Sequence, residues 1–164
     1  MSMIGNVVAV LPEQLQSFIE DPELIEAFLY PEDGDAEPDW HVDLDKAWHA
    51  IHFTLNGKTW EGEGPLFLAV LGGEEVGEDI GYGPARYLVP EHVKAVSAAL
   101  SAVTPEVFGD QFNPSALAAA EIYPDVWDRE GGDGLEYVQP FYIALRNFYM
   151  AAAERGDAVL IYLN

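Results

Sequence analysis

Short apolar runs lie near both ends of the sequence, and helical periodicity dominates between them. Residues 4–11 (IGNVVAVL) and 158–163 (AVLIYL) are rich in branched residues and carry apolar side chains on both faces. This pattern favours two buried strands. Residues 12–20 repeat apolar side chains at helical spacing behind a proline, and residues 135–153 do so over the longest stretch. These two segments are predicted helices, and Gly156 is well placed to end the second.

Shorter helices are predicted between these elements, most of them opened by a proline or a capping side chain. They are residues 23–30 behind Asp21 and Pro22, residues 43–57 behind Asp43, and helices that start at Pro90, after Thr104 and at Pro114 behind Asn113. Gly57 is a plausible stop for the second of these. Residues 62–75 (GEGPLFLAVLGGEE) are ambiguous between a short buried helix and a strand. Residues 85–89 read as a brief extended segment, and 31–40 as an exposed loop.

Buried strands at both ends of a mainly helical chain predict an α+β fold. We expect a small central sheet of three or four strands that includes the N- and C-terminal strands, surrounded by several helices. A length of 164 residues suits one domain over residues 1–164 and is enough to bury a sizeable core.

Charge is the most unusual bulk property, with 29 acidic against 7 basic residues and a formal net charge of −22. Binding to phosphate depends on lysine and arginine, so nucleic acid and anionic membranes are unlikely partners. The first 45 residues contain no lysine or arginine, and their acidic residues are Glu13, Glu20, Asp21, Glu23, Glu26, Glu32, Asp33, Asp35, Glu37, Asp39, Asp43 and Asp45. Two interpretations are open: a surface that attracts a basic protein, or an adaptation for solubility or high salt.

Several classes of chemistry lack the residues that they need. The chain has no cysteine, no GxSxG, no GxGxxG and no GxxxxGK[ST]. Residues 1–14 do not resemble a signal peptide, and no apolar stretch approaches the length of a spanning helix. We therefore expect a cytoplasmic protein without a cofactor, and the balance leans away from an enzyme.

The clearest candidate for metal chemistry is Asp45 with His49 and His52, at spacings of four and three residues on the predicted helix. Histidine pairs that bind zinc on a helix more often use a spacing of four, and no HExxH occurs. The favoured interpretation makes His52 a half-buried core histidine held by a backbone carbonyl or a carboxylate, and no metal is predicted.

A second group of candidates surrounds the turn GYGP. Asp79, Tyr82 and Arg86 lie beside it, and the arginine could hold a carboxylate or phosphate of a ligand. The alternative is an internal ion pair beside glycines that need positive φ. Tyr123 and Trp127 are interpreted as packing residues at a helix exit, or as the rim of a cleft.

Four segments together resemble a known family: DKAWHAIHFTLNG, GPLFLAVLGG, DIGYGPARYL and EIYPDVW. The chain resembles the YfbM-like family of small bacterial proteins over nearly its whole length. The family signature corresponds here to Asp45, Lys46, Trp48, His52 and Gly57, with the turn at 81–84 and the element at 122–124. The resemblance implies a single α+β domain of bacterial origin, and it implies no established activity.

Two functional hypotheses follow. The first is a non-catalytic acidic module of the inhibitor or immunity type that binds a basic protein; reversing Glu32, Asp33 and Asp35 would then weaken capture of the partner. The alternative is a small-ligand-binding protein or enzyme, with a pocket between the Trp48/His52 helix and the Tyr82/Arg86 turn. The sequence does not indicate an oligomeric state.

Overall fold

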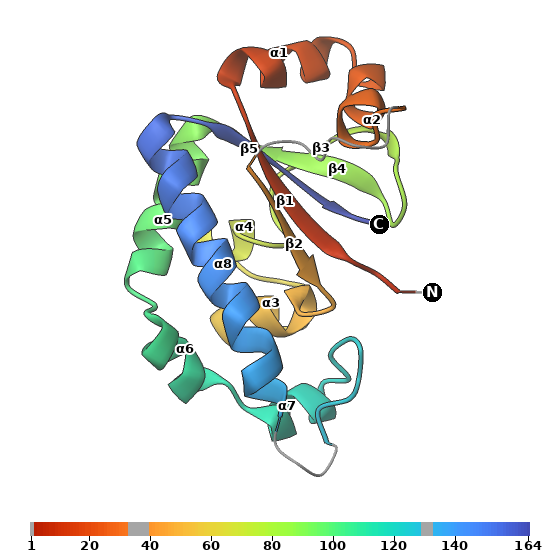
Figure 1. Cartoon of the computed structure of the whole chain (residues 1–164). Coiled ribbons are helices and arrows are strands. Elements are labelled where there is room, and N and C mark those ends of the chain that lie inside the picture. The colour runs from red at the N-terminus through yellow and green to blue at the C-terminus, as the bar shows by residue number, and fades with distance from the viewer. Residues whose placement is uncertain (1, 33–39, 129–132) are drawn as a thin grey trace.

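A computed structural model describes residues 2–32, 40–128 and 133–164 of the chain. The described residues form an α+β fold with one five-stranded antiparallel sheet (Figure 1). Its strands lie in the order β2-β1-β5-β4-β3, with the bounds β1 Gly5–Val10, β2 His41–Asp45, β3 Glu74–Asp79, β4 Pro84–Leu88 and β5 Ala158–Leu163.

Eight helices are present among the described residues, and they lie on both faces of the sheet and beyond one end of it (Figure 1). Their bounds are α1 Pro12–Glu20, α2 Glu23–Leu29, α3 Trp48–Asn56, α4 Pro65–Leu68, α5 Pro90–Ser101, α6 Pro105–Gln111, α7 Pro114–Ala119 and α8 Gly134–Arg155. None of the described helices is both long enough and apolar enough to cross a membrane.

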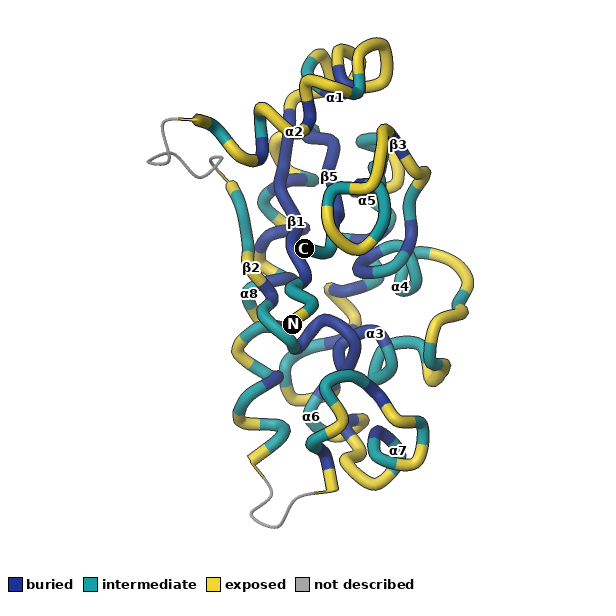
Figure 2. The backbone as a smooth tube through the Cα atoms, turned by 90° about the vertical axis from the view of Figure 1, so that its right-hand side faces the viewer, coloured by how far each residue is buried: buried dark blue, intermediate teal, exposed yellow. Residues whose placement is uncertain are grey.

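The two strands predicted from the terminal apolar runs lie side by side at the centre of the sheet. They pair over their full lengths, from Gly5 opposite Leu163 to Val10 opposite Ala158. Every residue of β1 is buried (Figure 2). Val7 and Ile161 face the larger core, which α3, α5 and α8 help to form, while Val8 belongs to the smaller core beneath α1 and α2. Apolar runs without alternation therefore mark strands that are covered on both faces.

The expected sheet of three or four strands is wrong by at least one strand. The sequence pattern did not reveal β2 and β3, which are the two edge strands of the sheet. Val76 is the only apolar side chain of β3, and the other residues of that strand are exposed. Such a strand is stabilised by its pairing with β4 rather than by its own apolar pattern.

The predicted helix over residues 43–57 is also shorter than expected. Residues up to Asp45 belong to β2, and α3 begins at Trp48. Asp43 does not cap this helix; its Oδ1 accepts a hydrogen bond of 2.6 Å from the backbone N–H of Asp45, which has a φ of 49°. Leu44 and Ala47 are both buried although they lie on either side of this turn. Their spacing in the sequence is therefore the same as that of two residues on the apolar face of one helix.

Other helix ends agree with the sequence. Gly57 and Gly156 adopt left-handed backbone after α3 and α8, and the side chain of Asn113 accepts the N–H of Ala116 at the start of α7. For α2, Pro22 rather than Asp21 holds the N-cap position. The ambiguous residues 62–75 contain α4 and the first residues of β3. Most of the predicted loop 31–40, including Asp33 and Asp35, lies outside the described residues.

Close packing joins β1 to α3 at Gly5. A Cβ atom added to Gly5 would lie 2.6 Å from Cβ of Trp48, far inside van der Waals contact. Trp48 is fully buried, and its indole N–H donates to the Met3 carbonyl at 2.9 Å. The absence of a side chain at Gly5 is therefore what lets the helix approach the central strand.

We expect Gly5→Ala to lower the free energy of unfolding by about 1–3 kcal/mol, because the added methyl group overpacks the contact with Trp48. Gly109→Ala in α6 is the matched control, since its Cβ would make only ordinary contacts of 3.4 Å or more, with side chains of α8. That control should stabilise the protein by about 0.5–1 kcal/mol. Urea unfolding of both variants measures the two effects, and equal changes in the two would contradict this account of the packing.

Candidate functional site

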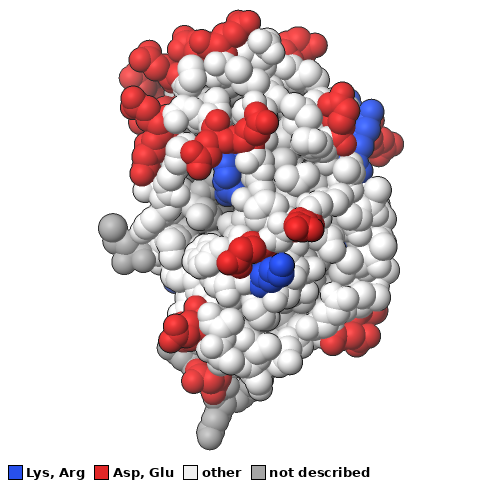
Figure 3. Space-filling view, turned by 180° about the vertical axis from the view of Figure 1, so that it is seen from behind, with Lys and Arg blue, Asp and Glu red and all other residues white. Residues whose placement is uncertain are grey.

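One end of the molecule carries a dense set of exposed carboxylates. The exposed acidic residues of α1, α2, β3 and their adjoining turns are Glu13, Glu20, Asp21, Glu23, Glu26, Glu32, Glu74, Glu75, Glu78 and Asp79. The elements α1, α2 and β3 contain no lysine or arginine. Figure 3 shows red side chains gathered over the end that carries these elements in Figure 1. We call this set the acidic end.

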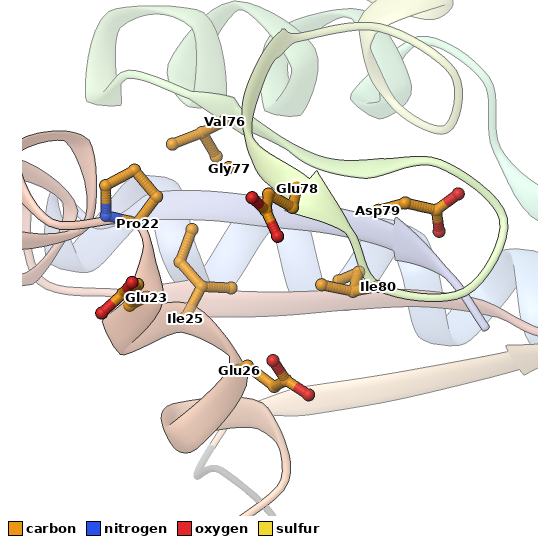
Figure 4. A pocket seen from close by; sticks show the side chains of 9 residues that line it. All are labelled: Pro22, Glu23, Ile25, Glu26, Val76, Gly77, Glu78, Asp79 and Ile80. Carbon is orange, nitrogen blue, oxygen red and sulfur yellow. The ribbon is translucent and has the colours of Figure 1, made fainter.

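A groove opens in the acidic end between α2 and β3 (Figure 4). It encloses about 520 Å³. Apolar side chains from both elements line it, and carboxylates stand around them. The lining residues are Pro22, Ile25, Val76, Gly77 and Ile80, together with Glu23, Glu26, Glu78 and Asp79. The groove therefore combines an apolar floor with an anionic rim.

The local backbone explains how the rim is built. The pairing of β3 with β4 is irregular between Val76 and Asp79, and Gly77 has a φ of 81°. A bulge of this kind re-aims side chains, and Glu78 points from β3 toward α2 (Figure 4). At the same place β3 lies close to the start of α2. A Cβ atom added to Gly77 would lie only 3.2 Å from Cβ of Pro22.

The carboxylates of the rim differ in their bonding. Oδ1 of Asp79 accepts hydrogen bonds from the N–H groups of Gly81, at 2.7 Å, and Gly83, at 3.2 Å. Asp79 is therefore engaged in the turn between β3 and β4. Within the described part of the chain, the carboxylates of Glu23, Glu26 and Glu78 form no hydrogen bond or ion pair with the protein. These three acids are open to a cation from outside.

The two histidines of α3 are structural in this fold. His49 Nε2 lies 2.9 Å from the Thr59 carbonyl, and its Nδ1 accepts the N–H of Tyr123 at 2.9 Å. His52 Nε2 lies 3.1 Å from the Glu61 carbonyl. Carbonyl oxygens only accept, so Nε2 carries a proton in both rings. The Nδ1 atom of His49 accepts the N–H of Tyr123, and Nδ1 of His52 lies 3.3 Å from the side-chain amide nitrogen of Asn56, so both rings are neutral. Both side chains are buried, and together they hold the backbone of residues 59–61 against α3.

Burial sets the protonation of these rings. It lowers the pKa of His49, and it lowers the pKa of His52 to about 4 against the opposing effect of the hydrogen bond to Glu61. The rings therefore stay neutral at physiological pH. The predicted role of His52 as a core histidine held by a carbonyl agrees with this geometry, although it is fully rather than half buried.

The suggested metal trio does not converge. Asp45 lies at the end of β2 and not on the helix, and its Oδ2 accepts the hydroxyl of Tyr137 at 2.7 Å. Burial and this hydrogen bond raise the pKa of Tyr137. His49 and His52 use Nε2 for backbone carbonyls. Among the described residues no group of histidine and acidic side chains could hold a metal ion.

The other predicted site residues separate into two places. Trp48 packs against His49 and Tyr123, with ring centroids 5.0 and 5.8 Å apart. Tyr123 is bound to the N-terminal segment, because its hydroxyl accepts the Met3 N–H at 2.9 Å. These contacts are internal, and they make Trp48 and Tyr123 part of the packing between α3 and the segment before β1.

Arg86, Tyr82 and Asp79 belong to the hairpin of β3 and β4. The Arg86 guanidinium donates to the Gly72 carbonyl at 3.0 Å, and burial lowers its pKa. Arg86 lies opposite Ile161 in the pairing of β4 with β5, and Ile161 belongs to the larger core, so Arg86 lies on the face of the sheet that this core covers. Tyr82 lies in the exposed turn, where its N–H donates to Leu163 at 3.2 Å. The burial of Trp48 and His52 counts against an open ligand pocket between them and this turn.

Sequence reasoning missed Glu78 and Ile80 as members of a site. The segment GGEEVGED, residues 72–79, places four acidic side chains around a single valine. That composition could have indicated an edge strand with a charged border. Nothing in the sequence brings this strand next to α2, which precedes it by more than forty residues.

Comparisons with known proteins assign the chain to a family. Residues 1–162 match the family described as "Domain of unknown function (DUF1877)", and the chain belongs to this family. A similar solved structure is the crystal structure of a protein of unknown function, YfbM from Escherichia coli. The two chains share 23% identity with a TM-score of 0.75, over 98% of this chain and 99% of that one. The resemblance to YfbM-like proteins is thereby confirmed, and the likeness to that structure shows a common fold.

No curated protein matches the chain. The family and the solved structure carry no stated activity, so the function rests on the geometry described above.

We expect acid to destabilise the fold through His52. Its pKa in the folded state, about 4, lies below the unfolded value of about 6.5, so the unfolded chain binds more protons between these two pH values. Stability is therefore lost as the pH falls from about 6.5 toward 4, by up to about 3 kcal/mol from this group.

Urea unfolding over this pH range tests the assignment. His52→Gln should flatten the pH dependence of the unfolding free energy, while His92→Gln, at an exposed position of α5, should leave the slope of the native protein unchanged. Equal slopes in all three proteins would contradict a buried neutral His52.

Proposed function

We propose that this protein is a non-catalytic interaction module that binds a basic protein through the acidic end. The observation that carries the proposal is the concentration of exposed carboxylates on α1, α2 and β3, three elements without a single cation. A face of one sign attracts and orients a partner of opposite charge and raises the rate of association.

Two of the described arginines are engaged in contacts within the protein. Arg155 pairs with Asp157 at 2.7 Å and lies 4.0 Å from the ring of Trp40. Arg146 donates to the carbonyls of Leu100 and Ser101, at the end of α5. Among the described residues, no ion pair joins a lysine or arginine to a carboxylate of α1 or α2.

The module is proposed to act in the manner of an inhibitor or an immunity protein. In such a protein the bound surface covers a basic region of the partner and so prevents that region from meeting its own ligand. The histidines support this view over an enzyme, because His49 uses both ring nitrogens and His52 uses Nε2 in bonds that hold the protein's own backbone.

The test is affinity capture from cells that express the tagged protein, with two variants of equal net charge. The first reverses acids of the acidic end: Glu13→Lys, Glu20→Lys, Glu23→Lys and Glu26→Lys. The second reverses exposed acids of α5, α6 and α8: Glu91→Lys, Glu106→Lys, Asp110→Lys and Glu154→Lys. Glu32, which is also exposed, is a further position for reversal.

The native protein should retain a basic protein that is released by moderate salt, because screening weakens contacts between exposed charges. The first variant should lose about tenfold or more of the captured partner, and the second should keep more than about half. A captured partner that is acidic, or that resists salt, would overturn the proposal. So would the absence of any captured protein, which would leave the charge as an adaptation for solubility.

A further inference from the structure

We propose that the groove between α2 and β3 receives a short segment of the basic partner, with one apolar side chain in the groove and lysine or arginine on either side of it. This proposal rests on the proposed function and assigns the chemistry of the contact. The apolar side chain would meet Ile25, Val76 and Ile80, and the flanking cations would pair with Glu23, Glu26 and Glu78.

The volume and lining of the groove suit an apolar side chain. About 520 Å³ accommodates a large aliphatic or aromatic side chain with adjoining backbone. Ile25 points from α2 toward β3, and Ile80 lies on the opposite side of the space (Figure 4). A purely electrostatic surface needs no such hollow, so this lining indicates an occupant that also has an apolar part.

The rim of the groove carries the three open carboxylates of Glu23, Glu26 and Glu78. A preference for acids in the first turn of a helix explains Glu23 and Glu26 on α2. Protection of an edge strand explains a charge on β3. Neither effect explains why Glu78 points toward α2, whose Glu23 and Glu26 line the same groove (Figure 4). Like charges around one groove repel each other, and a bound cation relieves this repulsion.

The negative charge of the rim determines which kind of segment can bind in the groove. The rim has four acids and no base, so an acidic or neutral segment would add repulsion or leave the rim unpaired. In a segment with cations on both sides of one apolar residue, one cation can pair with the acids of α2 while the other pairs with the acids of β3. A basic segment of this kind fits both the floor and the rim.

The experiment uses the full chain and two synthetic peptides of equal charge. One is rich in lysine with a single central leucine, and the other has serine in place of that leucine. Fluorescence anisotropy at low salt should show about tenfold tighter binding of the leucine peptide, the ratio expected when much of a leucine side chain leaves water. Equal affinity for the two peptides would overturn the proposal.

Two charge variants locate the contact. Glu26→Lys with Glu78→Lys changes the rim from both sides, and Glu13→Lys with Glu20→Lys makes the same change of net charge on α1, outside the groove. We expect the rim variant to lose at least about tenfold in affinity for the leucine peptide and the α1 variant to lose less than about threefold. Equal losses in the two variants would overturn a specific groove.

Chemical-shift mapping on the native protein keeps the test independent of the folding of any variant. The leucine peptide should shift the amide signals of residues 23–26 and 76–80 more than those of α1. If the largest shifts lie outside these residues, the groove is not the contact.

The outcomes separate the two proposals. Capture of a basic partner that is lost in the α1 variant but kept in the rim variant would reject the groove and leave the proposed function standing. Tight, leucine-dependent binding in the groove without capture of a basic protein would reject the proposed function instead.

Discussion

The antiparallel pairing of β1 with β5 is the interaction on which the rest of the structure depends. Both strands carry apolar side chains on both faces of the sheet. Because these two strands lie in the middle of the sheet, helices must cover it from both sides. Helices α3, α5 and α8 help to cover one face, and the short pair α1 and α2 covers the other. The acidic end exists because the thinner of these two layers carries five of the twelve acids of the first 45 residues and lies beside β3, which adds four more.

The sequence predicted those elements whose signal is local. Strands β1 and β5 follow from unbroken apolar runs, and α1 and α8 from long periodic stripes with proline or glycine at their ends. The edge strands β2 and β3 could not be found in this way. Their stability comes from backbone pairing with neighbours that are distant in sequence, and Val76 alone does not make a pattern. The turn at Asp45 hid β2 further, since Leu44 and Ala47 reach the core from either side of it.

The same difference between local and distant contacts decides which features of the candidate site could be predicted. His52 could be recognised as a structural histidine from its place beside an apolar stripe, because the helix fixes that neighbourhood. The partners of Asp45 and Trp48 could not, since Tyr137 and Met3 come from other parts of the chain. The groove depends on a contact between α2 and a strand with almost no apolar residues, and only the folded chain brings Ile25 and Glu78 together (Figure 4).

The central position of β5 has a consequence for how the protein is made. The strand pairs with both β1 and β4, so the sheet remains divided until residues 158–163 have left the ribosome. Contacts between such distant parts of a chain form slowly, because a large loop must close before they are made. We expect the strong negative charge of the N-terminal third to disfavour association between chains during this interval, while the apolar strand β1 is still unpaired. The acids of α1 and α2 that we propose for recognition would then also limit aggregation of the nascent chain.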